Sequence, residues 1–568
     1  MIERMLRATL LSCLLFCALV VQAADGTPQR GVVASAHPAA TVAGLETLAQ
    51  GGNAFDAAVA VAAALAVAEP YGSGLGGGGF FLLRQAGETP TYRFLDARER
   101  APLSAGPDLY RRDGQVQREL SLNGPLAAAI PGLPAALALL AERYGTLPLS
   151  HSLTPAIRLA RDGVGIDRVY RERVEWRLEA MQADAETARI FLDQGQAPQE
   201  HGLLRQPELA ATLQRLADGG QAGFYGGETA RLLLQGVRSA GGIWSEQDLR
   251  EYRVVERQPL RFALAEGREL ISAPPPSAGG VAIAQSLAML QQLPWREAGD
   301  VQRSHYVVEV LRRAYRDRGL LGDPDQVRNP LTQLLDAQYL KGLASSIQLQ
   351  HATPSSSLPP APAWREGDHT THFAVLDNQG NAVAATLSIN LPFGAAFTVP
   401  GTGLLLNNEM DDFAADPSGS NVYGLAGSQA NAIAGGKRPL SSMSPTFIES
   451  ETELASFGTP GGSRIPSMVL LAILDYLDAK PVKQWPATPR YHHQFLPDVI
   501  EYEPGAFSAG QRASLELRGH TLSQVGRRYG NQQVLLWHKP DGRVEAASDP
   551  RGIGRADFWP ATNAEAGR

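Results

Sequence analysis

The longest nearly unbroken run of hydrophobic positions beyond the N-terminus covers residues 53–68, where Asn53 and Asp56 are the only polar side chains. An amphipathic surface helix alternates polar and apolar faces, whereas a helix without a polar face is buried on all sides. The pattern therefore predicts a core helix over 53–68. A preceding helix is expected to end at Gly51-Gly52, and a strand-like run over 80–84 follows a glycine-rich segment at 72–79.

A different pattern begins at Thr370. Two β-rich runs, Thr370–Asp377 and Ala382–Asn390, are separated by a four-residue turn that contains Gly380, which predicts a β-hairpin. The preceding stretch, 350–368, is rich in proline and serine and predicts an exposed linker without regular structure. Such a linker ordinarily marks a domain boundary, and here it leads straight into a buried strand.

Between these regions, helical patterns punctuated by glycine and proline cover much of residues 130–350, for example 134–144, 305–320 and the end of the 330s into the 340s. No fixed-period repeat appears. The 568 residues allow two to four domains or one large layered domain. The net charge is -7 and no basic face is evident, so nucleic acid is not an expected partner.

The first 23 residues predict a secretory signal peptide, with a positive start, a short apolar run and small residues for cleavage after Ala23. An uncleaved membrane anchor and a lipoprotein acceptor at Cys13 are the alternatives. Cys13 and Cys17 are the chain's two cysteines, so the mature protein would contain no disulfide, thiol nucleophile or thiolate metal site. We expect an exported protein, periplasmic or secreted, without stable membrane association.

Two local patterns point to other chemistry, but the context of each argues against it. Residues 72–77 match G-x-G-x-x-G, yet a helix enters this loop and a strand leaves it, the reverse of a dinucleotide site. Close backbone packing is the better interpretation. His492 and His493 are adjacent, so on a strand they would point to opposite faces and could not bind one metal ion. No G-x-S-x-G motif supports an α/β-hydrolase.

Thr370 offers more specific chemistry. A threonine hydroxyl is a weak nucleophile unless a base lies within reach. If the His369–Thr370 bond is broken, the new α-amine, with an ordinary pKa of about 7.7–8.0, can take the proton of that hydroxyl. Thr370 would then be nucleophile and base together, which requires a chain start inside a folded domain.

Other segments could complete such a site. Gly461-Gly462 can turn two amides toward one oxyanion, and the acidic and amide run 407–412 suits a substrate ammonium. Arg98 and the pair Ser441-Ser442 are candidates for a substrate carboxylate. Each also has a structural interpretation as a capped turn, a solvated loop or a surface arginine.

Taken together, these segments resemble the γ-glutamyltranspeptidase (glutathione hydrolase) family of N-terminal-nucleophile hydrolases. The resemblance runs from about Gly31 almost to the C-terminus. It rests on an ordered set of motifs: GGNAFDAAVAVAAALAV, LGGGGF, DARERAP, PPPSAGG, LGDPD, TTHFAVLD, NNEMDDF, NVYGL, KRPLSSMSPT, TPGGSRI, YHHQFLPD and ASDPR.

The resemblance implies an α+β fold, a four-layer αββα sandwich, made as a single-chain precursor that cuts itself into a heterodimer. Residues 24–369 would form the large subunit, with 349–369 as an exposed linker before the cleavage site, and 370–568 the small one. Thr370 is implied as the nucleophile both for self-cleavage and for catalysis. Thr371 matches a neighbouring threonine that assists the amine.

The resemblance also implies how the γ-glutamyl group is held. Gly461 and Gly462 would form the oxyanion hole and Tyr423 a lid over the bound group. The other implied contacts are Arg98, Ser441 and Ser442 with the α-carboxylate, and Asn390, Glu409 and Asp412 with the α-amino group.

Two positions in the site vary within the family. Ser388 replaces a common threonine, which leaves the rate of self-cleavage open. Glu409 stands where relatives carry Glu or Gln, and its charge favours donors with a free α-amino group.

The reaction implied is acyl transfer from γ-glutamyl donors such as glutathione to water or to amino acids and dipeptides, with no metal or organic cofactor. A glutaryl- or cephalosporin-type acylase on the same scaffold is the nearest alternative. A non-catalytic exported paralogue is another, and it would remain one uncut chain.

Overall fold

The computed structural model describes residues 26–359, 369–414 and 428–560. The expected signal peptide and the expected lid residue Tyr423 lie outside these ranges. Within them, no helix is both long and apolar enough to cross a membrane.

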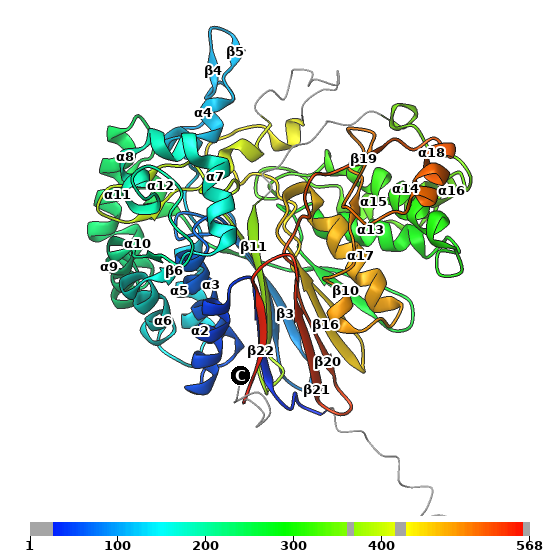
Figure 1. Cartoon of the computed structure of the whole chain (residues 1–568), viewed down its shortest axis with the longest axis horizontal. Coiled ribbons are helices and arrows are strands. Elements are labelled where there is room, and N and C mark those ends of the chain that lie inside the picture. Colours follow the sequence, from blue (N-terminus) through cyan, green and yellow to red (C-terminus); the bar gives the residue numbers. More distant parts are fainter. Residues whose placement is uncertain (1–25, 360–368, 415–427, 561–568) are drawn as a thin grey trace, which may run out of the picture.

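Two antiparallel sheets form the centre of the molecule (Figure 1). The first has seven strands in the order β22-β1-β11-β12-β2-β3-β8, and the second has six in the order β21-β20-β16-β15-β10-β9. The first sheet contains β1 Gly31–Ser35, β2 Gly78–Gln85, β3 Thr91–Ala97, β8 Val255–Arg257, β11 Thr370–Leu376, β12 Ala382–Ser388 and β22 Arg555–Trp559. The second contains β9 Leu260–Ala263, β10 Glu269–Ser272, β15 Thr446–Glu449, β16 Glu453–Gly458, β20 Gln533–His538 and β21 Arg543–Ser548.

Helices cover the outer face of each sheet, which gives the four layers expected for an αββα sandwich (Figure 1). The helices on the first sheet include α2 Pro38–Ala49, α3 Ala54–Ala68, α5 Leu133–Arg143 and α6 Leu149–Asp162. Those on the second include α13 Gly279–Leu290, α14 Asp300–Arg318, α16 Ala337–Ser345 and α17 Ile465–Leu477. The helix and strand predictions from the sequence are confirmed within a few residues at each end.

α3 confirms the prediction of a helix buried on all sides, since each of its 15 residues is buried. Asn53 caps its first turn, where its side chain accepts from the amides of Phe55 and Asp56 and the Asp56 carboxylate accepts from the Asn53 amide. The helix packs behind the hairpin of β11 and β12, on the face where Phe373 and Val375 belong to its hydrophobic cluster. The apolar helix thus forms the support on which the central strands rest.

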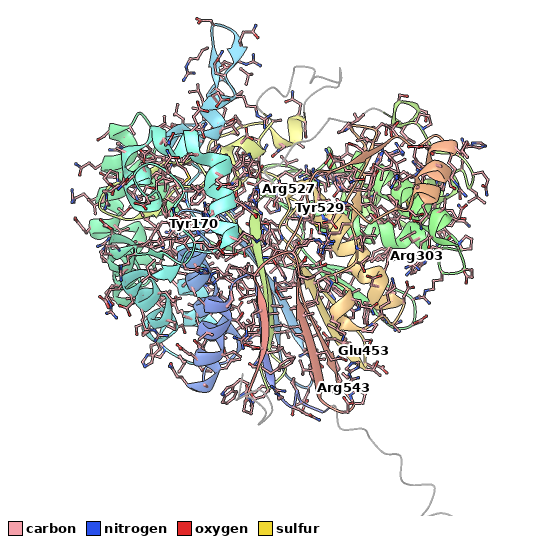
Figure 2. All side chains as sticks on the ribbon, viewed as in Figure 1. Tyr170, Arg303, Glu453, Arg527, Tyr529 and Arg543 are labelled. Atoms are coloured by element: carbon pink, nitrogen blue, oxygen red, sulfur yellow. The ribbon has the colours of Figure 1, made fainter. Side chains whose placement is uncertain are left out.

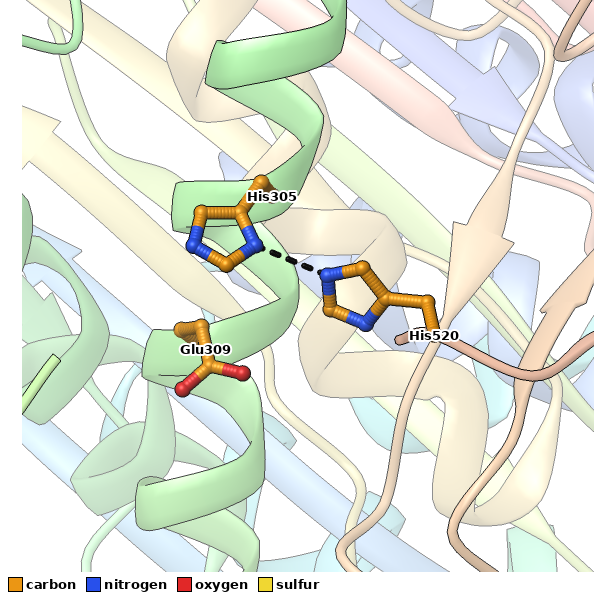
Figure 3. Close-up of side chains that lie close together, drawn as sticks. All are labelled: His305, Glu309 and His520. Atoms are coloured by element: carbon orange, nitrogen blue, oxygen red, sulfur yellow. Dashed lines mark hydrogen bonds between the residues drawn. The ribbon is translucent and has the colours of Figure 1, made fainter. Parts of the chain in front are cut away.

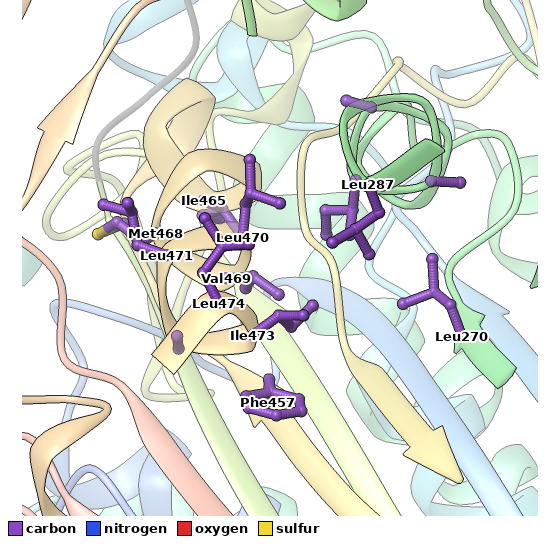
Figure 4. Close-up of a cluster of buried hydrophobic side chains, with 14 of the residues drawn as sticks. Leu270, Leu287, Phe457, Ile465, Met468, Val469, Leu470, Leu471, Ile473 and Leu474 are labelled. Carbon is purple, nitrogen blue, oxygen red and sulfur yellow. The ribbon is translucent and has the colours of Figure 1, made fainter. Parts of the chain in front are cut away.

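A second hydrophobic cluster fills the space between the sheets and under α13 and α17. Figure 4 shows part of it, with Ile473 of α17 directed toward Phe457 of β16. Ala374 and Leu376 of β11 join this cluster from the other sheet. Because side chains alternate along a strand, β11 presents one set of residues to α3 and the other to the space between the sheets. Thr370 belongs to the second set.

The prediction of an exposed linker over 349–369 is wrong for residues 353–357, which belong to the described part of that segment. Ser355–Ser357 forms a turn of 3₁₀ helix, and Thr353 and Ser355 are buried. The Ser355 amide donates to Asp498, and its hydroxyl donates to the carbonyl of Phe495. Proline and serine exclude a long helix here, but they do not prevent side-chain hydrogen bonds that hold the segment against the protein.

Candidate active site

Thr370 is the first residue of β11, a central strand of the first sheet, and pairs with Ser388 on β12. Its hydroxyl oxygen is buried and has no hydrogen-bond partner among the described residues. Thr370 lines a small cavity of about 10 Å³, far below the roughly 300–1,000 Å³ usual for drug-sized ligands. The pocket is lined by Arg98, Thr370, Ser388, Asn390, Asp412, Ser441, Ser442, Met443, Gly462 and Ile465. Seven of the residues singled out in the sequence besides Thr370 therefore meet at its hydroxyl.

The peptide bond before Thr370 is held on both sides. The His369 amide donates to the Asn390 carbonyl at 3.2 Å, and the Ser388 hydroxyl donates to the His369 carbonyl oxygen at 3.4 Å. The Asn390 amide in turn donates to the Ser388 oxygen at 2.8 Å. Asn390 has a φ of 73°, a left-handed conformation that asparagine tolerates better than most residues. This turn carries β12 back toward the carbonyl carbon that Thr370 would attack.

The His369 ring is buried against the edge of Trp176, with ring centroids 4.8 Å apart. Burial lowers the pKa of His369 well below its usual value, and nearby guanidinium groups, foremost those of Arg173 and Arg527, lower it further. Arg527 also stacks on Trp176 and lies near the upper end of β11 in the view of Figure 2. The histidine is therefore neutral at physiological pH and provides no charge at the bond.

Gly461 and Gly462 lie where β16 gives way to α17. Their φ angles are 138° and 55°, in the region that side chains rarely adopt. A Cβ on Gly461 would lie 2.5 Å from the Met468 terminal carbon. Within the described ranges, neither amide is used as a hydrogen-bond donor. Two amide donors at the start of a helix can stabilise an oxyanion, as expected from the sequence.

Arg98 lines the same pocket and lies among three carboxyl groups. Its guanidinium contacts Glu409 at 2.8 Å, Asp412 at 2.5 Å and Glu99 at 3.6 Å. Its Nε also donates to the Pro439 carbonyl at 3.2 Å. Burial alone would lower the pKa of Arg98, but Glu409, Asp412 and Glu99 raise it overall. The guanidinium is permanently charged and faces more acidic groups than it can neutralise.

Two of these carboxyl groups have raised pKa values, chiefly because they are buried and secondarily because the acidic groups repel one another. Burial raises the pKa of Glu409 to about 7, although Arg98 opposes the shift. Burial likewise raises the pKa of Glu99 to about 7. A cationic group entering the pocket would relieve this excess, because an opposite charge stabilises ionised carboxylates. The arrangement therefore suits a ligand that carries an ammonium next to a carboxylate.

Ser441 and Ser442 complete the carboxylate side. The Ser442 oxygen accepts from Arg318 Nη2 at 2.9 Å and Nε at 3.2 Å, and the Ser441 oxygen accepts from the Met443 amide at 3.1 Å. Since each oxygen already accepts, each hydroxyl proton remains available for an anion. The PPPSAGG segment supports this loop, because the Pro276 carbonyl accepts from the Ser441 amide.

Thr371 points to the other face of β11. Its hydroxyl donates to Glu69 Oε2 at 2.7 Å, behind the strand and away from the pocket. The glycine-rich segment lies against the same strand ends, where a Cβ on Gly77 would be 2.2 Å from the Ser388 carbonyl oxygen. Close backbone packing, rather than a phosphate site, therefore accounts for these glycines.

A cluster of His305, Glu309 and His520 has the residue types of a metal site (Figure 3). However, both oxygens of Glu309 already accept hydrogen bonds, from Arg313 and from the Thr353 amide. His305 Nδ1 and His520 Nε2 lie 2.8 Å apart, and His305 Nε2 contacts the Gln348 carbonyl. These contacts assign a proton to His305 Nε2 and one to the bond between the rings. The hydrogen bonds of Glu309 and of His305 thus give the cluster a structural role, joining α14 to the segment after α18, Ala509–Leu517.

His492 and His493 are likewise satisfied. His492 contacts the Ser467 hydroxyl at 2.8 Å, whereas His493 contacts Asp498 at 3.1 Å. The two rings therefore contact different side chains, as structural histidines would.

Comparison with known proteins agrees with this geometry. The family model described as gamma-glutamyltranspeptidase matches residues 40–559. The chain belongs to the γ-glutamyltranspeptidase family. The resemblance inferred from the motifs is thereby confirmed, and with it the assignment of the chain to a family of enzymes.

Relatives within the γ-glutamyltranspeptidase family match nearly the whole chain. The glutathione hydrolase proenzyme of Pseudomonas sp. (strain A14) is 39% identical over 563 residues, which is 97% of each chain. The glutathione hydrolase proenzyme of Escherichia coli K12 is 38% identical and covers 92% of this chain and 91% of its own.

Solved structures show the same fold. A cephalosporin acylase from Bacillus halodurans aligns with a TM-score of 0.84 and 27% identity over 94% of this chain and 97% of that one. The γ-glutamyltranspeptidase of Helicobacter pylori aligns with a TM-score of 0.55 and 35% identity over 59% of this chain and 95% of that one.

Three buried charged residues of this γ-glutamyltranspeptidase site were not found from the sequence: Glu69, Glu99 and Arg318. Glu99 could have been found from the sequence, because it directly follows Arg98. Two adjacent charged residues are unusual in a buried segment, so an Arg98 that enters a pocket draws attention to its neighbour. Glu69 and Arg318 end α3 and α14, where charges are ordinarily read as solvated helix ends. Only the tertiary structure shows that they are buried.

Proposed function

We propose that this protein is a γ-glutamyltransferase and glutathione hydrolase that creates its own nucleophile by cleaving the His369–Thr370 bond. The observation that carries the proposal is the position of Thr370: its hydroxyl has no hydrogen-bond partner among the described residues, and the residue lines a small pocket together with Arg98 and Asp412. The charges of that pocket suit an amino-acid head group, and the Thr370 hydroxyl would attack the γ-carbonyl of a glutamyl group bound there.

In self-cleavage, Thr370 Oγ1 attacks the carbonyl carbon of His369 and the amide nitrogen leaves, which converts the peptide bond into an ester. This step passes the Oγ1 proton to the leaving nitrogen, which becomes the α-amine of Thr370. Water then cleaves the ester and releases the Thr370 hydroxyl and the carboxylate of His369. The Ser388 hydroxyl donates to the oxygen on which negative charge develops. The products are two subunits, 24–369 and 370–568, that remain together as a heterodimer because β11 is central to the shared sheet.

In catalysis, the amine of Thr370 takes the hydroxyl proton while Oγ1 attacks the γ-carbonyl of the donor. The oxyanion is stabilised by the Gly461 and Gly462 amides, and the proton passes to the leaving amine. Water or the amine of an amino acid or dipeptide then attacks the γ-glutamyl ester. This returns the proton to Thr370 and completes the transfer.

The donor's head group is held by opposite charges. Arg98, Ser441 and Ser442 bind the α-carboxylate, and Glu409, Asp412 and Asn390 bind the α-amino group. A glutaryl group lacks that amine and would leave the acidic groups unpaired, at a cost of about 1–3 kcal/mol or more. We therefore favour γ-glutamyl donors such as glutathione over the glutaryl or cephalosporin substrates of an acylase, and expect Tyr423 to close over the bound group.

The discriminating experiment compares γ-glutamyl-p-nitroanilide with glutaryl-p-nitroanilide on the self-cleaved enzyme. We expect at least about a tenfold preference in kcat/KM for the γ-glutamyl compound, equivalent to about 1.4 kcal/mol. Preference for the glutaryl compound would favour the acylase, and an uncut, inactive chain would favour the non-catalytic paralogue. For localisation, we propose export to the periplasm or medium after removal of residues 1–23, which fractionation and N-terminal sequencing would test.

A further inference from the structure

Glu69 is a buried carboxylate directly behind the strand that carries Thr370. It follows the last residue of α3 and is 3% exposed. Each of its oxygens accepts a hydroxyl: Oε2 from Thr371 at 2.7 Å and Oε1 from Tyr71 at 3.1 Å. A charge in the core is costly unless it is hydrogen-bonded or paired. The steps of acyl transfer described above make no use of it.

The hydrogen bond from Thr371 to Glu69, called the tether below, reaches β11 without entering the pocket. Adjacent residues of a strand point to opposite faces, so Thr371 bonds to Glu69 on the α3 side while Thr370 faces the substrate. The turn after Glu69 also lies against the backbone of Thr370, because a Cβ on Gly72 would be 3.4 Å from the Thr370 carbonyl oxygen. The Glu69 carbonyl accepts from the Gly72 amide at 2.8 Å, which fixes that turn.

Self-cleavage changes what holds Thr370. In the intact chain, the bond from the His369 amide to the Asn390 carbonyl restrains the residue from its N-terminal side. After the cut, that bond no longer acts on Thr370, which becomes a chain end, and chain ends fray unless they are tied down. A displacement of about 1 Å at a reacting group can cost about 100-fold in rate.

Resting on the function proposed above, we propose that Glu69 is a positioning residue for Thr370. By accepting the Thr371 hydroxyl, it holds the first two residues of β11 in register, both before self-cleavage and when Thr370 is a free N-terminus.

Both oxygens of Glu69 accept hydroxyl protons, as an ionised carboxylate does. Burial raises its pKa overall, although His37 and the hydroxyls of Thr371 and Tyr71 oppose that rise. The Tyr71 ring is fixed between the edges of Tyr170 and Phe393. Glu69 is thus fixed through Oε1 by the immobile ring of Tyr71, and its Oε2 accepts from Thr371 on the strand.

The test uses the full chain with substitutions at both ends of the tether. Glu69→Ala and Thr371→Val should each slow self-cleavage by about 10- to 100-fold. In the fraction that does cleave, kcat for γ-glutamyl-p-nitroanilide per active site should fall by at least about 10-fold while KM changes by less than about threefold. Thr371→Ser and Glu69→Gln keep a hydroxyl donor and a side-chain acceptor, and should restore most of both rates.

The double variant Glu69→Ala/Thr371→Val separates positioning from general destabilisation. If the two residues act through one contact, the rates of the double variant should be about as low as those of either single variant. If they act independently, the two rate reductions should multiply. Asp56→Asn is the matched control, because it removes a buried charge at the other end of α3 without touching β11. We expect it to lower thermal stability while the split fraction keeps its wild-type kcat.

Two results would overturn the assignment of Glu69. One is a Glu69→Ala enzyme that cleaves and turns over at wild-type rates. The other is a fall in kcat in Glu69→Ala that Asp56→Asn matches at an equal loss of thermal stability. Wild-type protein that neither splits nor hydrolyses γ-glutamyl-p-nitroanilide would instead refute the proposed function itself, so the two failures are distinguishable.

Discussion

The hydroxyl of Ser388 donates to the carbonyl oxygen of His369 at 3.4 Å, across the register pair that joins β12 to β11. This contact lies on the peptide bond that Thr370 would break. We predict that Ser388→Ala slows self-cleavage by at least about 10-fold. In other enzymes, removing one hydrogen-bond donor to a developing oxyanion lowers the rate by about 10²–10³-fold. A time course on denaturing gels after expression measures it.

Ser388→Thr is the matched variant, because it keeps the hydroxyl and restricts its rotation. We expect it to split at least as fast as the wild type. Rapid splitting of Ser388→Ala would show that the hydroxyl takes no part in the cleavage.

Substrate binding should weaken below neutral pH through Glu409, since burial raises the pKa of this carboxyl group to about 7. As the pH falls through that value the carboxylate is protonated and loses its attraction for the donor's ammonium. KM for γ-glutamyl-p-nitroanilide should therefore rise between pH 8 and 6 in the wild type. In Glu409→Gln it should be higher at pH 8 and change less with pH; equal pH profiles for the two enzymes would count against this role.

Arg98 is expected to contribute both to the stability of the fold and to substrate binding. Without its charge, three buried carboxyl groups lose their common partner, and breaking a buried ion pair costs about 3–5 kcal/mol. Arg98→Met should lower the melting temperature of the protein, and Arg98→Lys should raise KM by at least about 10-fold because lysine lacks the fork of donors. Arg158→Ala, which breaks an exposed pair with Glu46, is the control and should leave both nearly unchanged.

How far the sequence could predict this molecule depends on the kind of signal. The periodicity of residues 53–68 and the hairpin after Thr370 report burial directly, so α3, β11 and β12 were predictable. Contacts between distant segments leave no such trace. Glu69 and Thr371 are 302 positions apart, and their hydrogen bond follows only from the packing of α3 behind β11. The motif resemblance brought Arg98, Glu409 and Asp412 into one site, but it could not show that they already contact one another.

The stability of the fold should fall in mild acid because of its buried neutral histidines. Burial lowers the pKa of His372, His492 and His520 to about 3 each. In the unfolded chain these groups bind protons below about pH 6.5, so their contribution is complete above that pH and is lost as the pH falls toward 3. Each should cost about 1.4 kcal/mol per pH unit within this window.

Urea unfolding of the uncut Thr370→Ala chain at pH 7 and pH 5 measures the effect without subunit dissociation. The free energy of unfolding should be lower at pH 5. His520→Asn, which keeps a side-chain donor next to His305, should reduce the difference, and an unfolding free energy that is equal at the two pH values would contradict the account.

The central claim is that Thr370 cuts the chain before itself and then serves as the nucleophile. N-terminal sequencing of the fragments separated on a denaturing gel tests it most directly. The account predicts a smaller fragment that begins TTHFAV in the wild type, and a single uncut, inactive chain for Thr370→Ala. A Thr370→Ala chain that still splits between residues 369 and 370, or an active wild-type chain that never splits, would contradict it.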